Sequence, residues 1–217
     1  MIDKDLVNTF SIVAYDPENR EWGVGVASKF LAVGSMVPWA KAKIGAVATQ
    51  AWGNPNYGPD GLELLAEGKT PDEAVKILTE ADSSREYRQL AVIDKAGNTA
   101  VHTGEDCSEW AGSIEGKNYA VQGNLLVSRK TLKDMAETFE YKKGRLADRI
   151  IACLEAGQEA GGDRRGRQAA ALFVVKKGCG INNLDDRYID LRVDDHKTPI
   201  KELKRLLRLF YEQRNDC

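Results

Sequence analysis

The sequence predicts an α+β domain in which antiparallel strands and paired helices pack in layers. Residues 9–28, 89–103 and 110–123 each contain two alternating apolar runs separated by turn residues, which is typical of β-hairpins. Residues 132–154 instead carry two apolar stripes at helical spacing, interrupted by Gly144. Because the chain lacks a regular strand–helix–strand alternation, the pattern disfavours a parallel doubly wound sheet. It favours packed sheets of about nine strands flanked by helices.

The length and the charge of the chain limit the classes of protein to which it can belong. Its 217 residues are 42% hydrophobic, which suffices for one sizeable core and predicts a single compact domain. The formal net charge is −2, so no overall field attracts nucleic acid or an anionic membrane, and we expect neither as a partner. Symmetric self-association into a homo-oligomer is the default expectation for the quaternary structure.

The cysteines and the first residues predict a cytoplasmic protein without a metal or another cofactor. Four widely spaced cysteines and only two histidines argue against structural zinc and against a disulfide framework, so we expect reduced thiols. Residues 1–10 are acidic where a signal peptide is basic. No apolar stretch approaches the roughly 20 residues of a membrane-spanning helix.

Alternation of side-chain character predicts the individual strands. Residues 9–16 alternate and pair in a hairpin with residues 22–28, whose glycines predict a close approach of another part of the chain. The apolar run 44–51 predicts a strand that is buried on both faces. Residues 169–175 and 187–193 are two further strand candidates.

Capping residues mark the predicted helices. Thr70 and Glu73 can form a capping box at the start of a helix over 71–78, with Pro71 in its first turn, and a short helix over 62–67 precedes it. Apolar spacing predicts the other helices, which are a pair over 132–139 and 146–161 and a final helix that begins at Thr198 and Pro199.

The segment 161–168, GGDRRGRQ, is a candidate for binding an anion. It combines glycines with Arg164, Arg165 and Arg167, whose guanidinium groups suit forked hydrogen bonds to a carboxylate or phosphate. Asp163 could orient these arginines. The segment lacks the Gly-Lys-Ser/Thr of a phosphate-binding loop, and the competing interpretation is a solvated basic turn that pairs with nearby acids.

Two other patterns suggest weaker candidates. Residues 185–196, DDRYIDLRVDDH, could hold a divalent cation in a metal-dependent hydrolase, but adjacent strand residues point to opposite faces. His102 lies in the return strand of a hairpin, where a single histidine is more often structural than catalytic. Residues 23–29, GVGVASK, begin like a dinucleotide-binding loop but lie inside a strand, so we reject that interpretation.

Five blocks of the sequence are long and idiosyncratic. They are TFSIVAYDPENREWGVGVASKFLAVGSMVPWA, GAVATQA, QGNLL, GGDRRGRQAAAL and DLRVDDH, and they run in this order from Thr9 to His196. Together they resemble the DUF1028 family, which is grouped with the N-terminal nucleophile (Ntn) hydrolases. The resemblance implies a four-layer αββα sandwich of two antiparallel sheets between helix layers, in agreement with the hairpins and helix pairs.

The resemblance also implies that Thr9 is a catalytic nucleophile. In Ntn hydrolases the residue that opens the first strand attacks an amide carbonyl, and its free α-amino group, with a pKa of about 8, serves as the base. Relatives often begin Met-Thr, so we expect residues 1–8 to be an N-terminal extension of a single Ntn-like domain over 9–217. Self-cleavage between Asn8 and Thr9, a misassigned start and a retained extension that blocks the amine all remain open.

Polar residues at the ends of neighbouring strands complete the implied site. Ser28 and Lys29 close the strand that pairs with that of Thr9, where they could lower the pKa of the nucleophile or orient it. Lys43, before the strand 44–51, resembles the active-site lysine of proteasome-type enzymes and is an outside candidate. Neutral donors for an oxyanion hole are Thr49, Gln50, Gln122 and Asn124, with Ser11 as an auxiliary hydroxyl.

The sequence leaves two functions open. The first is an Ntn-type amidohydrolase that cleaves the C–N amide bond of a small amino-acid conjugate or peptide through an acyl ester of Thr9. Its candidate substrate-binding residues are Asp163, Arg164, Arg165, Arg167 and Gln122, with one of the arginines holding a substrate carboxylate. The second is a noncatalytic protein on the same fold that binds a carboxylated small molecule or peptide through the arginine segment without cleaving it. An uncleaved, ordered extension before Thr9 favours the second function.

Overall fold

The computed structural model describes residues 7–214, which form ten strands and five α-helices. The strands are β1 (Thr9–Asp16), β2 (Glu21–Ser28), β3 (Pro38–Lys41), β4 (Gly45–Ala51), β5 (Arg88–Asp94), β6 (Thr99–Thr103), β7 (Gly112–Gly116), β8 (Tyr119–Gly123), β9 (Ala169–Lys176) and β10 (Arg187–Val193). The helices are α1 (Tyr57–Ala66), α2 (Pro71–Glu80), α3 (Lys130–Tyr141), α4 (Leu146–Glu159) and α5 (Pro199–Gln213). None of these helices is long and apolar enough to cross a lipid bilayer.

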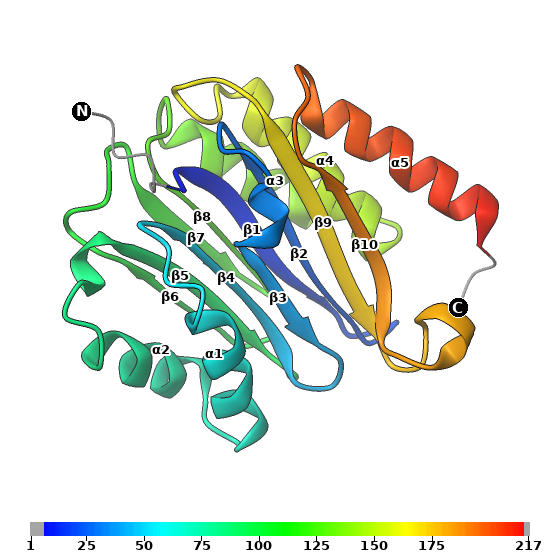
Figure 1. Ribbon diagram of the computed structural model, residues 1–217, viewed down its shortest axis with the longest axis horizontal. Helices are drawn as coiled ribbons and strands as arrows, with labels where there is room; N and C mark the ends of the chain where they lie inside the picture. The colour runs from blue at the N-terminus through cyan, green and yellow to red at the C-terminus, as the bar shows by residue number, and fades with distance from the viewer. Residues whose placement is uncertain (1–6, 215–217) are drawn as a thin grey trace.

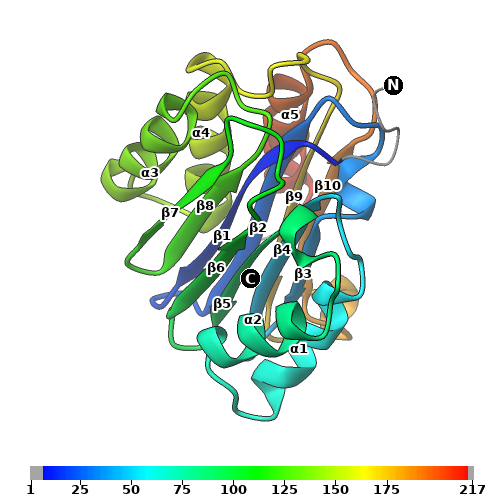
Figure 2. The ribbon, with the colours of Figure 1, turned by 90° about the vertical axis from the view of Figure 1, so that its left-hand side faces the viewer.

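Two antiparallel sheets stack between two layers of helices (Figure 1). The larger sheet has the strand order β10-β9-β2-β1-β8-β7, and the smaller sheet has the order β3-β4-β5-β6. Helices α3, α4 and α5 pack on the larger sheet, whereas α1 and α2 pack on the smaller one, at the opposite side of the molecule (Figure 2). The prediction of two antiparallel sheets flanked by helices is therefore confirmed.

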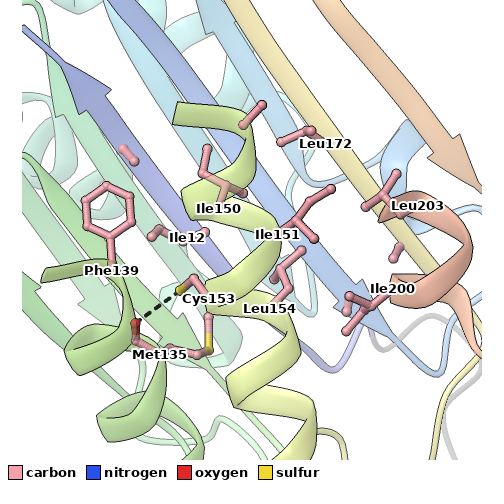
Figure 3. Close-up of a cluster of buried hydrophobic side chains, with 14 of the residues drawn as sticks. Ile12, Met135, Phe139, Ile150, Ile151, Cys153, Leu154, Leu172, Ile200 and Leu203 are labelled. Atoms are coloured by element: carbon pink, nitrogen blue, oxygen red, sulfur yellow. Dashed lines mark hydrogen bonds between the residues drawn. The ribbon is translucent and has the colours of Figure 1, made fainter. Parts of the chain in front are cut away.

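Apolar clusters fill the spaces between the layers. Ile12 of β1 lies with Ile150 and Leu154 of α4 in the cluster between the larger sheet and its helices (Figure 3). Val13, the next residue of β1, lies instead in the cluster between the two sheets. A third cluster lies between the smaller sheet and α1 and α2. Alternation along β1 thus directs even-numbered side chains toward the helices and odd-numbered ones, Thr9 among them, toward the smaller sheet.

Two glycines of β2 allow α4 to lie directly on the larger sheet. A Cβ atom added at Gly23 would lie 2.7 Å from Cδ1 of Ile150, and one added at Gly25 would lie 2.3 Å from Cγ2 of the same residue. Both distances are far below the 3.5–4.0 Å of a favourable carbon–carbon contact. The close approach that the glycines predict is confirmed.

The sequence pattern does not predict β3 or the first turn of α1. β3 is a four-residue edge strand that begins with Pro38, a residue that the edge of a sheet tolerates. α1 begins at Tyr57 rather than near Leu62, in a segment rich in turn residues. There Gly58 packs so closely on Trp39 that an added Cβ would lie 2.3 Å from the indole ring. The first turn of α1 thus depends on packing against β3, which lies about 20 residues earlier in the chain.

The cysteines do not all behave as expected. Cys107 and Cys153 are free thiols, whereas Cys179 takes part in a disulfide, contrary to the expectation of reduced thiols throughout. Burial raises the pKa of Cys107 to about 11 and also raises the pKa of Cys153. Neither free thiol is therefore a ready nucleophile at neutral pH.

Candidate functional site

The start of β1 is enclosed by the ends of β2 and β4. β1 and β2 pair with Thr9 opposite Ser28, and Val7, just before β1, bridges to Ala51 at the end of β4. The start of β1 is the dark blue end of the ribbon in Figure 1. Asn8 is 2% exposed and Thr9 is 0% exposed, so the peptide bond between them is shielded from solvent.

The carbonyl oxygen of Asn8 accepts hydrogen bonds from two strong donors. The Ser28 hydroxyl donates to it over 2.5 Å, and Nη2 of Arg165 donates over 2.8 Å. Such donors stabilise the negative charge that a carbonyl oxygen acquires when its carbon is attacked. The hydroxyl of Thr9, the next residue, donates to the carbonyl oxygen of Val7 over 2.8 Å. The peptide bond between Asn8 and Thr9 thus has a polarised carbonyl on its Asn8 side and a side-chain hydroxyl on its Thr9 side.

A buried carboxylate positions Arg165. Asp163, which is 2% exposed, accepts from Nε of Arg165 over 3.1 Å and from its Nη2 over 2.8 Å. The same carboxylate accepts from the backbone N–H of Lys29 over 2.9 Å. Gly161 and Gly162, with φ angles of 122° and 61°, turn the chain just before Asp163 in a conformation that favours glycine. Because its oxygens are occupied by the protein, Asp163 holds the guanidinium rather than a ligand.

A network of buried amides lies next to Thr9 between the sheets. The Gln50 side chain donates to the Thr9 carbonyl oxygen over 3.3 Å and to Oε1 of Gln89 over 2.7 Å. The Asn124 side chain also donates to Oε1 of Gln89, over 3.0 Å, and Ser11 donates to Oε1 of Gln50 over 2.7 Å. The network thus holds the carbonyl of Thr9 and not that of Asn8, which is held by Ser28 and Arg165.

The sequence did not predict Gln89 as a site residue, and it predicted Gln122 as a donor for an oxyanion hole. The Gln89 side chain accepts from Gln50 and Asn124 and donates to the carbonyl oxygen of Gly123. The sequence signal for it is a glutamine on the same face of β5 as Ala91, where the other residues are apolar. The Gln122 side chain donates to the Ala48 carbonyl oxygen over 3.0 Å and to Ser11 over 3.4 Å. Gln122 therefore connects β8 to β4, and its side-chain amide donates to these atoms rather than to the Asn8 carbonyl oxygen.

Thr49 and Lys43 do not join this group. Gln50 is directed toward β1, so alternation directs Thr49 toward the helices on the smaller sheet, where its hydroxyl donates to the Asn54 carbonyl oxygen over 3.1 Å. Lys43 occupies the turn before β4, at the end of that strand opposite Ala51. Neither side chain is in position to act on the peptide bond that precedes Thr9.

Neighbouring arginines of the segment 161–168 have different partners. Whereas Arg165 binds Asp163, Nη2 of Arg164 donates to the carbonyl oxygens of Glu109 and Leu126 over 2.6 and 3.4 Å. Arg164 therefore ties its loop to the segment before β7 and the segment after β8. The glycine-rich loop is an ordered part of the fold and not only a solvated basic turn.

Arg167 and Lys29 face solvent in a cleft beside the end of β2. Both side chains are exposed, and they line a cleft of about 590 Å³. The backbone N–H of Gln168 donates to the carbonyl oxygen of Ser28 over 2.9 Å, which joins the cleft to the site. The remaining lining residues are Asp195, His196 and Lys197. Three cationic side chains against one carboxylate make the cleft suited to an anion.

A cluster of Asp82, Arg88 and Tyr57 holds the chain just after β4, at Trp52, in place. Asp82 accepts from Nε of Arg88 and from the Tyr57 hydroxyl, each over 2.9 Å, and Arg88 also donates to the carbonyl oxygen of Trp52. Burial opposes ionisation of Asp82, but hydrogen bonds from Arg88, the Ser84 amide and Tyr57 outweigh it and lower its pKa to about 2. The carboxylate is therefore ionised at neutral pH and fixes Arg88 beside the end of β4.

Three aspartates of the segment 185–196, Asp185, Asp186 and Asp190, bind cationic side chains or backbone amides. Asp190 accepts from Nε of Arg192 over 2.9 Å, and Asp186 pairs with Lys177 over 3.2 Å. Within residues 7–214, no group of three or more histidine, cysteine, aspartate or glutamate side chains could hold a metal ion.

Comparison with known proteins places the fold in a family. Residues 9–203 match the model of a family described as "Family of unknown function (DUF1028)". The chain belongs to the DUF1028 family. It is similar to the crystal structure of protein SPO2555 from Silicibacter pomeroyi, also assigned to DUF1028, with a TM-score of 0.87 and 32% sequence identity over 96% of this chain and 88% of that chain. No curated protein matches.

The first residue of the DUF1028 match lies within the candidate site. The match begins at Thr9, so it includes Ser28, Asp163 and Arg165, which surround the Asn8 carbonyl. It does not include Asn8 itself. The side chains around the carbonyl therefore belong to the DUF1028 region of the chain, whereas the residue that fills the space between them lies outside it.

Proposed function

We propose that this DUF1028 protein is an amidohydrolase of the N-terminal nucleophile type, with Thr9 as the nucleophile. The observation that carries the proposal is the Asn8 carbonyl oxygen, which accepts from Ser28 and Arg165 directly beside the Thr9 hydroxyl. This is the arrangement needed to free the α-amino group of Thr9 by self-cleavage. The two-sheet fold and the resemblance to the Ntn hydrolases support it.

Self-cleavage begins when the Thr9 hydroxyl leaves the Val7 carbonyl and attacks the Asn8 carbonyl carbon. The bond between Oγ1 and that carbon forms, and Ser28 and Arg165 stabilise the negative charge on the oxygen. The carbon–nitrogen bond then breaks, the hydroxyl proton passes to the leaving nitrogen, and an ester of Asn8 on Thr9 results. Water hydrolyses the ester to a carboxylic acid, leaving Thr9 with a free amine and a free hydroxyl.

The same groups then act on an amide substrate. The free α-amino group accepts the proton of the Thr9 hydroxyl, because its ordinary pKa of about 8 leaves part of it neutral near pH 7. Ser28 and Arg165 polarise the substrate carbonyl as they polarise that of Asn8, while Gln50 and Asn124 hold the backbone of Thr9. An acyl ester forms, the amine product leaves, and water releases the acid.

The three arginines of the segment 161–168 have different roles. Arg165 is committed to a carbonyl oxygen and to Asp163, and Arg164 is committed to two backbone carbonyls. Arg167, with Lys29 beside it, is left to bind a substrate carboxylate in the exposed cleft.

A noncatalytic binding protein is the second candidate, and one observation favours it. Val7 and Asn8 are nearly fully buried and Val7 pairs with Ala51, so these two residues cover Thr9. A chain that retains these residues has no free amine at Thr9 and offers only the outer cleft to a carboxylated ligand.

The intact mass of the untagged full-length chain, followed over several days and backed by N-terminal sequencing, decides between the two. We expect a species that begins at Thr9, and we expect Thr9→Ala to abolish it. Ser11→Ala, which removes a buried hydroxyl on the same face of the same strand, is the matched control and should still cleave. If the wild-type chain persists at full length, the binding function is favoured and self-cleavage is contradicted.

The two arginines provide a second test. Arg165→Ala removes a charge-assisted donor from the Asn8 carbonyl and should slow self-cleavage about 100- to 1,000-fold, the usual effect of losing one oxyanion donor. Arg164→Ala makes the same change one residue away, where the guanidinium binds other carbonyls, and should slow cleavage far less. Mass spectrometry of both time courses measures the difference, and equal rates would remove Arg165 from the mechanism.

A further inference from the structure

Val7 and Asn8 fill a buried space beside the end of β4, and we call this space the groove. The backbone N–H of Val7 donates to the Ala51 carbonyl oxygen over 2.7 Å, and the Ala51 N–H donates back to the Val7 carbonyl oxygen over 3.0 Å. This reciprocal pair is the pattern of antiparallel strands. Val7 thus adds one residue of strand to the end of β4, and its side chain packs into the core between the sheets.

The end of β4 is shaped to accept this partner. Ala51 has a φ of 68°, a left-handed conformation that is uncommon for a residue other than glycine. It pairs with Arg88 of β5 on one side and with Val7 on the other. If Val7 leaves after cleavage, the N–H and carbonyl oxygen of Ala51 that face it lose their partners. Unpaired strand edges of this kind bind extended peptides by backbone hydrogen bonds.

Asn8 indicates which kind of side chain fits directly before the bond to Thr9. Its side chain is buried, and Oδ1 has no hydrogen-bond partner among the described residues. A neutral carboxamide tolerates such a place better than an ionised carboxylate, whose burial without a partner is much more unfavourable. The guanidinium of Arg165 does not reach this side chain, because its Nε and Nη2 donate to Asp163 and to the backbone carbonyl oxygen of Asn8.

We propose that the groove filled by Val7 and Asn8 is the acyl-side binding site of the processed protein, and that its ligand is a peptide. The peptide is extended where it passes the end of β4, and it pairs with Ala51 through the second residue before the cleaved bond. It carries a neutral, carboxamide-like residue directly before that bond, where Ser28 and Arg165 hold the carbonyl oxygen. The inference rests on the proposed function and adds a substrate class to it.

The test uses the chain that begins at Thr9, which is the processed form. Residues 9–214 contain all the described strands and helices, and Val7 is the one described core side chain that precedes them. Thermal unfolding of this chain checks that the fold persists. The probe is acetyl-Ala-Val-Asn-amide, and calorimetry measures its dissociation constant with both the wild-type chain and Thr9→Ala.

Three altered peptides locate the ligand. Methylation of the valine nitrogen removes the donor to Ala51 and should weaken binding about fivefold or more. Methylation of the alanine nitrogen is the matched control, because alternate N–H groups point away from the paired strand, and it should change binding less than twofold. Replacement of asparagine by aspartate should weaken binding about tenfold. The full-length uncleaved chain, whose groove is filled, should bind all four peptides weakly.

The outcomes separate this inference from the proposed function. Equal binding of the two methylated peptides, equal binding by the full-length chain, or no binding at all would overturn the peptide groove, even if the wild-type chain hydrolyses other amides. Hydrolysis is measured separately, with the anilide of acetyl-Ala-Val-Asn as the substrate of the wild-type chain. If Thr9→Ala binds the unmodified peptide more tightly than the valine-methylated and aspartate peptides, the groove is supported, whether or not this anilide is hydrolysed. Absence of that hydrolysis counts against the amidohydrolase alone.

Discussion

At the level of single residues, the central feature of the candidate site is the Arg165 guanidinium, which the buried carboxylate of Asp163 holds in place. The two oxygens of Asp163 fix the fork of Arg165, so that Nη2 points at the carbonyl oxygen of Asn8 without having to be ordered during a reaction. Ser28 completes the pair of donors because it ends β2 directly opposite Thr9. A lysine at position 165 would keep the charge but lose the bidentate geometry that positions it.

Asp82 gives a prediction for the pH dependence of stability. Its pKa in the folded protein is about 2, below the ordinary value of 3.8, so its ionised form stabilises the fold above about pH 4. That contribution, on the order of 2 kcal/mol, is lost as the pH falls from about 4 to about 2. Urea unfolding at several pH values should show the wild-type advantage over Asp82→Asn shrinking across this interval. A constant difference from pH 7 to pH 2 would contradict the assignment.

The register of the first hairpin is the decisive feature at the level of secondary-structure elements. The Asp16 carboxylate accepts from the Glu18 amide over 2.9 Å and from the Asn19 side chain over 2.9 Å, which fixes the turn between β1 and β2. Thr9 and Ser28, at the far ends of the two strands, therefore face each other. A shift of one residue would move Ser28 to the opposite face of the sheet and remove it from the Asn8 carbonyl.

The contact between α4 and β2 gives a prediction at the same level. Gly25→Ala places a methyl group 2.3 Å from the Ile150 side chain, so that side chain or α4 must shift, and we expect the free energy of unfolding to fall by about 1–3 kcal/mol. Gly53→Ala is the matched control, because the nearest atom there is 3.7 Å from the added Cβ. Chemical denaturation of both variants measures the difference, and similar stabilities would show that the helix is not in close contact with the strand.

At the level of the whole molecule, the site forms where the ends of separate elements meet. β1 and β2 of the larger sheet, β4 of the smaller sheet and the loop before β9 each contribute groups to it. The buried amides join the sheets at this end, because Gln50 and Gln89 belong to one sheet and Gln122 to the other. An unpaired amide between the sheets would be unfavourable, so the network also fixes how the sheets align.

The cationic cleft beside the site gives a prediction at this scale. Arg167→Ala should weaken binding of a carboxylated ligand to the processed chain about three- to tenfold, and should hardly affect its methyl ester. The difference should shrink at high salt, because the cleft is open to solvent. Arg208→Ala removes the same charge from an exposed position on α5 and is the control. Titration calorimetry at two salt concentrations is the measurement, and an equal loss for acid and ester would exclude a carboxylate site.

The amino-acid sequence by itself determined most of the secondary structure of this DUF1028 protein. The alternation of 9–16, the capping box at Thr70 and the glycines of β2 act over short distances, and each led to the observed element. The sequence also indicated the arginine segment by its composition, whereas Thr9 and Ser28 were indicated by the resemblance to the Ntn hydrolases.

Only the tertiary structure decided how these residues divide their roles. That Arg165 and not Arg164 reaches the Asn8 carbonyl, that Thr49 faces the helices and that Gln89 joins the amides depend on how separate strands stack. The physical reason is that hydrogen bonds of side chains act over about 3 Å, whereas their partners here are many residues apart in the chain. Local periodicity fixes the face on which a side chain lies, and the packing of sheets and loops fixes what that face meets.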